Sequence, residues 1–133
     1  GVVCLEEKGQ VLALCEALYD KKALDIVAVH VEERTIIASW FILCSGRSVT
    51  QVKALCDELE KEAKVLGLDL RRREGYSQGQ WVVLDYSSIL VHLFIPDVRK
   101  YYNLERLWIE SPEQTIMFSL LKEEGSPEAA VQE

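Results

Sequence analysis

Side chains that could do chemistry occupy two places in the sequence. The first is Ser45-Gly46-Arg47-Ser48, where an apolar run gives way to a helical pattern. The first amides of a helix have no partner within it and attract anions, so this start is consistent with a phosphate site. The interpretation that we favour is a helix capped by Ser48, with Gln51 completing a capping box. The second place holds Asp85 and His92, an acid and an imidazole on neighbouring predicted strands.

Neither place completes a catalytic set. A dyad of Asp85 and His92 would need an adjacent nucleophile, and no Gly-x-Ser-x-Gly turn surrounds Ser45 or Ser48. The Ser-Gly turn also resembles that of nucleotidyltransferase-like folds, which hold two metal ions with paired carboxylates just after it. Here no acid follows until Asp57, and Asp85 alone cannot hold two metals. We expect no enzyme activity, no metal and no cofactor; the alternative is a nucleotide-binding or nucleotidyltransferase-like enzyme.

Charge is distributed unevenly along the chain. The 133 residues are 49% hydrophobic and 28% charged, as expected of one globular domain. Of the net charge of −7, residues 110–133 carry −5 and residues 1–109 only −2. Neither part has the basic face of a general nucleic-acid binder. We therefore expect a domain over residues 1–109 and an acidic, partly disordered tail over residues 110–133.

The cysteines and one histidine have structural interpretations. Cys15, Cys44 and Cys56 fall within apolar patterns without a C-x-x-C pair, so we expect small buried hydrophobes in a reducing compartment. Cys4 lies apart from these patterns. His30 is expected to be a hydrogen-bonded core or edge residue. No apolar run reaches the length of a membrane span, and we expect a cytoplasmic protein without a membrane partner.

The spacing of apolar residues predicts the elements that position these side chains. We expect helices over 10–22, 48–66, 97–102 and 104–109, a marginal helix over 116–121, and strands over 24–31, 40–44, 81–86 and 89–95. A polar turn at Glu32-Glu33-Arg34 joins the first two strands, Gly67 ends the long helix, and Asp97 caps a short one. This order predicts a single α/β (α+β) domain with a mixed sheet flanked by helices.

The predicted hairpin over residues 81–95 has two unlike faces. If Ser87-Ser88 is a two-residue turn, an apolar set faces the core: Tyr86 with Ile89, Leu84 with Val91, and Val82 with Leu93. The opposite set is mixed: Asp85 with Leu90, Val83 with His92, and Trp81 with Phe94. Such a mixed face is either covered by a helix or used as an interface, and both interpretations stay open.

Two basic clusters each allow a structural interpretation and a binding interpretation. Arg71-Arg72-Arg73 is either a solvated edge or a phosphate grip at the margin of a larger complex. The second cluster mixes basic and aromatic residues, the composition of interface hot spots: Arg99, Lys100, Tyr101, Tyr102, Arg106 and Trp108. Helical spacing could equally make part of it a core stripe. We expect Trp108 in the core and one of the two tyrosines exposed.

Three segments together resemble the Iojap family, the ribosomal silencing factors of bacteria and organelles (RsfS-like). They are Trp40-Phe41-Ile42-Leu43-Cys44-Ser45-Gly46-Arg47-Ser48-Val49-Thr50-Gln51-Val52-Lys53-Ala54, then Trp81–Phe94, then Arg99–Trp108. With Asp25-Ile26-Val27 the resemblance covers roughly residues 10–109. Many relatives have an acid where this chain has Ser39 and Gly-Asp where it has Ser87-Ser88.

The resemblance implies a nucleotidyltransferase-like fold that lacks the catalytic carboxylates. It implies binding to the large ribosomal subunit through its protein uL-fourteen, where the factor blocks the small subunit and lowers translation when nutrients are scarce. Its contact surface would include Trp81, Asp85, Tyr86 and Tyr102, with a partly exposed Tyr86 hydroxyl. The hairpin face adds His92.

The basic and aromatic cluster adds Arg99 and Tyr101 to the expected partner-binding residues. Peripheral contact with ribosomal RNA through Arg71, Arg72 and Arg73 is a further expectation. A homodimer through the hairpin face would compete with the ribosome for the same surface.

Overall fold

The computed structural model describes residues 6–31 and 38–125, whose strands form one mixed sheet. The strand order is β3-β4-β5-β2-β1-β6, in which β2 and β5 run parallel and all other neighbours antiparallel. The bounds are β1 (Leu24–His30), β2 (Trp40–Ser45), β3 (Arg72–Glu74), β4 (Trp81–Asp85), β5 (Ile89–Phe94) and β6 (Thr115–Ile116). The predicted single α/β domain with a mixed sheet is confirmed.

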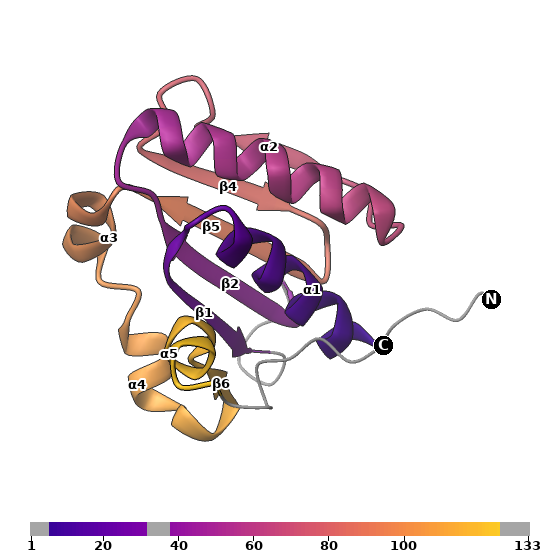
Figure 1. Ribbon diagram of the computed structural model, residues 1–133, viewed down its shortest axis with the longest axis vertical. Coiled ribbons are helices and arrows are strands. Elements are labelled where there is room, and N and C mark those ends of the chain that lie inside the picture. The colour runs from indigo at the N-terminus through magenta and orange to yellow at the C-terminus, as the bar shows by residue number, and fades with distance from the viewer. Residues whose placement is uncertain (1–5, 32–37, 126–133) are drawn as a thin grey trace.

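Two long helices, α1 (Glu7–Asp20) and α2 (Val49–Val65), cover one face of this sheet (Figure 1). Their apolar stripes pack on inward residues of the central strands, including Ile42, Leu84 and Val91, all fully buried. The shorter helices gather at one end of the molecule: α3 (Pro96–Tyr102), α4 (Arg106–Glu110), a 3₁₀ turn (Pro112–Gln114) and α5 (Phe118–Glu123). None of the helices described is long and apolar enough to cross a membrane.

A second, smaller core lies on the opposite face of the sheet. Val27, Val29 and Leu43 are buried there beneath residues of α4 and the segment before it, such as Leu104 and Trp108. Strand β1 is therefore apolar on both faces, which explains its continuous run of valine and isoleucine. Strand β4 is separated from β1 by β5 and β2. The smaller core therefore covers the outer side of the β4–β5 hairpin only in part.

Helix α2 begins and ends as its sequence predicts. Ser48 Oγ accepts a hydrogen bond from the Gln51 amide at 3.1 Å, and Gln51 Oε1 accepts one from the Arg47 amide at 2.6 Å. Gly67 follows the helix with φ of +79°, and Leu68 N donates back to the Ala63 carbonyl at 2.9 Å. Side chains of the helix thus occupy amides that an anion would use, which favours the capped helix over a phosphate site.

The hairpin register is confirmed, with Asp85 opposite Leu90 and Trp81 opposite Phe94. Ser87 takes a positive φ of 77°, where serine lacks the freedom of glycine. The Asp85 carboxylate accepts a hydrogen bond from the Ser87 amide at 2.8 Å, which fixes the turn. Asp85 therefore stabilises a turn that the sequence Ser87-Ser88 by itself favours only weakly.

The C-terminal segment differs from its prediction. Instead of a helix over 116–121, residues Thr115–Ile116 pair with β1 and a helix follows over Phe118–Glu123. Phe118 is fully buried in the main core, and Ser119 Oγ accepts a hydrogen bond from the Ile26 amide at 2.8 Å. The packed body therefore continues past residue 109, where the sequence predicted the end of the domain.

Smaller differences have local causes. Asp97 does not cap α3, because the helix begins at Pro96 and Ile95 takes the cap position without a side-chain bond. Helix α1 begins three residues before the predicted start. Cys4, the turn Glu32-Glu33-Arg34 and the predicted disorder of 126–133 lie outside the described residues.

Replacing Phe118 with alanine tests whether α5 belongs to the folded unit. We expect Phe118→Ala to lower the free energy of unfolding by about 3–5 kcal/mol, because a fully buried ring leaves a cavity. Guanidinium unfolding followed by circular dichroism measures it. The control Ile109→Ala, at a side chain 70% exposed, should change stability by less than about 0.5 kcal/mol. Equal small effects for both variants would contradict the packing.

Candidate functional site

The outer side of the β4–β5 hairpin is the candidate functional site. Along β4 the side chains alternate between buried and half-buried, so Trp81, Val83 and Asp85 point away from the layer of α1 and α2. Leu90, directly opposite Asp85 on β5, is half-buried on the same side. This is the face that the sequence marked as mixed, and no helix of the described chain covers it completely.

Aromatic rings form a continuous row across this face. Ring centroids lie 5.3 Å apart for Phe41 and His92, 5.3 Å for Trp81 and Phe94, and 4.6 Å for Trp81 and Tyr102. A further 5.0 Å separates the rings of Tyr102 and Tyr101. We call this row the aromatic face: Phe41, Trp81, His92, Phe94, Tyr101 and Tyr102. It joins strands β2, β4 and β5 to helix α3.

His92 fixes the position of Trp81 within the aromatic face. The indole Nε1 of Trp81 donates to His92 Nδ1 at 3.2 Å, so the proton of the neutral ring is on Nε2. Burial lowers the pKa of His92 to about 4. A proton on Nδ1 would remove the acceptor that Trp81 uses. His92 is therefore a neutral positioning residue near pH 7, and Nδ1 is not free to serve as a general base.

Asp85 and two arginines border the aromatic face at the hairpin turn. Besides the Ser87 amide, Asp85 faces Arg72, whose Nη2 lies 3.8 Å from Oδ2. Arg71 Nη1 donates to Ser87 Oγ at 3.2 Å. Arg73 points to the other side of β3, where it pairs with Glu60 of α2 at 3.0 Å. The basic run thus places two exposed arginines beside the aromatic face and uses the third within the fold.

Tyr86 and Arg99 do not lie on this surface. Tyr86 is 4% exposed and packs in the main core, and its hydroxyl is buried without a hydrogen-bond partner among the described residues. Burial raises the pKa of this hydroxyl. The expectation of a partly exposed hydroxyl is wrong, because the residue continues the inward side of β4. Arg99 is 5% exposed and donates to Ser45 Oγ at 3.0 Å.

Both tyrosines of α3 are exposed, where the sequence predicted one. Tyr101 is 80% and Tyr102 51% exposed, because α3 is short and ends at Asn103 in the left-handed conformation. Trp108 is half-buried on the smaller core, which agrees in part with its predicted place. His30 is half-buried and stacks on Trp40 with ring centroids 4.6 Å apart, as an edge histidine would.

The remaining chemical candidates are structural. Cys15, Cys44 and Cys56 are buried free thiols, and desolvation raises their pKa, to about 12 for Cys44 and Cys56. They are therefore protonated and unreactive near pH 7. Within residues 6–31 and 38–125, no group of three or more His, Cys, Asp or Glu side chains could hold a metal ion.

One motif escaped the sequence analysis. Gly75-Tyr76-Ser77-Gln78-Gly79 matches the Gly-x-Ser-x-Gly pattern, but it forms the loop between two antiparallel strands rather than a strand-to-helix elbow. Gly75 has φ of +83°, and a Cβ there would lie 2.1 Å from the Trp81 carbonyl oxygen. The glycines serve a tight loop, and Ser77 is an exposed loop residue.

Acid titration tests the role of His92. The unfolded chain takes up a proton near pH 6.5 while the folded His92 stays neutral to about pH 4, so stability falls as pH falls through this window. The full loss is roughly 3 kcal/mol. Urea unfolding from pH 7 to 4 should show a shallower loss for His92→Gln, whose amide oxygen can accept the Trp81 bond without titrating. Identical pH dependence in both proteins would contradict a buried neutral His92.

Comparisons with known proteins agree with this fold. A family model described as "Ribosomal silencing factor during starvation" matches residues 5–133. The ribosomal silencing factor RsfS of Halalkalibacterium halodurans is 44% identical over 96 residues, which are 72% of this chain and 82% of that protein. RsfS of Bacillus subtilis is 34% identical over 116 residues, 87% of this chain and 98% of that protein.

A solved structure shows the same architecture. A crystal structure of a Chromobacterium violaceum protein superposes with a TM-score of 0.75 at 35% identity, covering 78% of this chain and 87% of that one. The match of the family model extends beyond residue 109 and includes β6 and α5. The resemblance drawn from three sequence segments is confirmed: the chain belongs to the ribosomal silencing factor family.

Proposed function

We propose that this protein binds the large ribosomal subunit through its protein uL-fourteen and sterically blocks association with the small subunit, thereby repressing translation. The observation that carries the proposal is the aromatic face, a row of packed rings that ends in the exposed Tyr101 and Tyr102, on a chain of this family. The role needs no catalysis. It needs a rigid surface that holds a partner firmly where another subunit would dock.

The aromatic face has the physical character of a protein-binding surface. Tryptophan and tyrosine are enriched at the centres of interfaces because they bury large areas and lose few rotamers on binding. Here Trp81 is held by His92 Nδ1 and by the ring of Tyr102, so little side-chain freedom remains to be lost on association. Tyr101 and Tyr102 are the most exposed members and would contact the partner first.

Charge supports a protein rather than an RNA as the main partner. Residues 1–109 carry a net charge of −2, and Asp85 stands beside the aromatic face. An RNA-wrapping surface would need several free cations. Arg71 and Arg72 are exposed at the edge and could touch ribosomal RNA peripherally, whereas Arg73 is held by Glu60 and by the Tyr76 ring, 4.2 Å from its guanidinium.

A homodimer through the aromatic face stays an alternative use of the same surface. It would bury the rings that the ribosome-binding proposal requires, so the two states would compete. Light scattering at several concentrations distinguishes them. A mass that doubles with concentration in the unchanged protein but not in Tyr102→Ala would assign the face to self-association.

Two substitutions test the ribosome-binding proposal. Tyr102→Ala removes a half-exposed ring that packs against Trp81 and should weaken co-sedimentation with purified large subunits by roughly thirtyfold, the effect of a hot spot of about 2 kcal/mol. Asp85→Asn should weaken it less, because the amide can still accept the Ser87 bond while the charge is lost. Both proteins should remain folded by circular dichroism.

Matched controls separate the surface from the fold. Val65→Ala changes an exposed apolar residue at the end of α2, on the opposite side of the sheet, and should leave co-sedimentation unchanged. Tyr86→Phe removes only the buried hydroxyl and should also bind normally. If Tyr102→Ala binds as well as Val65→Ala, the aromatic face is not the contact surface.

A further inference from the structure

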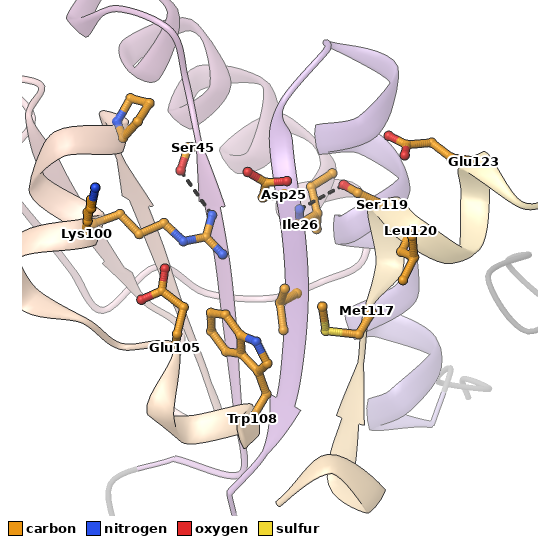
Figure 2. A pocket seen from close by; sticks show the side chains of 13 residues that line it. Asp25, Ile26, Ser45, Lys100, Glu105, Trp108, Met117, Ser119, Leu120 and Glu123 are labelled. Carbon is orange, nitrogen blue, oxygen red and sulfur yellow. Dashed lines mark hydrogen bonds between the residues drawn. The ribbon is translucent and has the colours of Figure 1, made fainter. Parts of the chain in front are cut away.

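A cavity of about 530 Å³ lies away from the aromatic face, between the start of β1, helix α3 and helix α5. Figure 2 shows Glu105 and Trp108 lining it from one side, Met117 and Leu120 from the other, and Asp25 on the strand between them. No residue of the aromatic face lines it. Its volume is within the usual range of small-molecule sites. Neither the family comparison nor the ribosome-binding proposal uses it.

Arg99 presents a buried cation to this cavity. Its guanidinium is 5% exposed and donates from Nη1 to Ser45 Oγ, the dashed contact to Ser45 in Figure 2. Among the described residues, no carboxylate oxygen forms an ion pair with it within 4.0 Å. Burial lowers the pKa of Arg99, as expected for a cation whose charge is only partly compensated. Its other donors can bind an anionic group in the cavity.

One acid at the same cavity needs a donor, and a second, exposed acid lies near it. Glu105 Oε1 is buried without a hydrogen-bond partner among the described residues, which is costly for a carboxylate oxygen. Asp25 sits at a bulge of β1 with a positive φ of 49°, and the register with β2 shifts between Leu24 and Val27. Bulges and strained residues commonly re-aim side chains at binding sites. The cavity thus offers the remaining donors of Arg99, one unsatisfied acceptor on Glu105 and the exposed carboxylate of Asp25.

Part of the lining is apolar. Trp108 lines the cavity on one side and Met117 and Leu120 line it on the other, with Ile26 on β1 beside Ser119 (Figure 2). Leu120 is 49% exposed although it is large and apolar. A ligand with an apolar portion would cover this surface and remove it from water.

We propose that the cavity binds a free α-amino acid with an apolar side chain. Its carboxylate pairs with the Arg99 guanidinium and the Ser45 hydroxyl, its ammonium group donates to Glu105 and Asp25, and its side chain packs on Trp108. Such a ligand would pair with the remaining donors of Arg99, which already bonds Ser45 and lies over the Trp108 ring, and with the unpartnered Glu105 oxygen. A ligand of this class would couple the factor to the supply of amino acids.

The charges of the lining disfavour a nucleoside triphosphate. Two cations, Arg99 and Lys100, face three acids, Asp25, Glu105 and Glu123. A polyphosphate would meet a net negative lining, whereas a zwitterion matches both signs. This separates the proposal from the nucleotide-binding alternative that the Ser-Gly turn suggested.

Isothermal titration calorimetry on the whole protein tests the proposal. We expect heat from L-leucine and L-phenylalanine, with dissociation constants below about 1 mM, the level at which binding is worth about 4 kcal/mol. Phenylpropionate lacks the ammonium group and phenethylamine the carboxylate, so each should bind at least tenfold more weakly than L-phenylalanine. Absence of heat from both amino acids up to about 10 mM would overturn the proposal. Tighter binding of GTP with magnesium would overturn it too.

A substitution in the lining identifies the site. Glu105→Gln removes the charge that receives the ammonium group and should weaken L-phenylalanine at least tenfold. Glu110→Gln, at the exposed last residue of the helix α4 that Glu105 precedes, is the matched control and should bind normally. Equal affinity for the two variants would show that the amino acid binds elsewhere. Arg99→Lys keeps the charge but loses the planar fork, and should also weaken binding.

Discussion

The parallel pairing of β2 with β5 is the constraint on which the rest of the structure depends. Parallel neighbours cannot be joined by a tight turn, so the chain must cross over one face of the sheet. Helix α2 makes this crossover, and the chain then returns through β3 and β4 at the edge before it enters β5. The helical cover therefore lies on one face of the hairpin, and its other face is left to the aromatic row. The same pairing places His92 of β5 opposite Leu43 of β2. The His92 ring then contacts the Phe41 ring within the aromatic face.

Local patterns predicted the parts of the fold that depend on neighbours in sequence. The register of the β4–β5 hairpin and the ends of α2 follow from alternation and capping, which a single segment encodes. Contacts between distant segments could not be predicted in this way. The bond from the Ile26 amide to Ser119 spans 93 residues, and the burial of Arg99 depends on where α4 folds back. Alternation along the strand predicted that Tyr86 points inward. It could not predict that the Tyr86 hydroxyl lacks a hydrogen-bond partner, because that depends on how the whole core packs.

Unsatisfied polar atoms are few among the described residues, and they adjoin the two surfaces with proposed roles. His92 Nε2 lies beneath the aromatic face, and Glu105 Oε1 faces the cavity beside Arg99. A domain gains stability by pairing such atoms, so their retention points to a use other than stability. The unpaired Nε2 of His92 belongs to a ring whose Nδ1 holds the Trp81 indole in place. The unpaired oxygen of Glu105 faces an open cavity. Tyr86 is the exception, for which the structure offers no such use.

The anchoring of β1 by α5 has a consequence for synthesis on the ribosome. Ile26 is made early, but its partner Ser119 is made 93 residues later, next to the core residue Phe118. Until then the bulged edge of β1 lacks its final cover, and a nascent chain with an uncovered edge is open to mispairing. Completion of the fold is thus delayed until α5 has left the ribosome. A product that stops before α5 would lack this closure and would be exposed to cellular quality control.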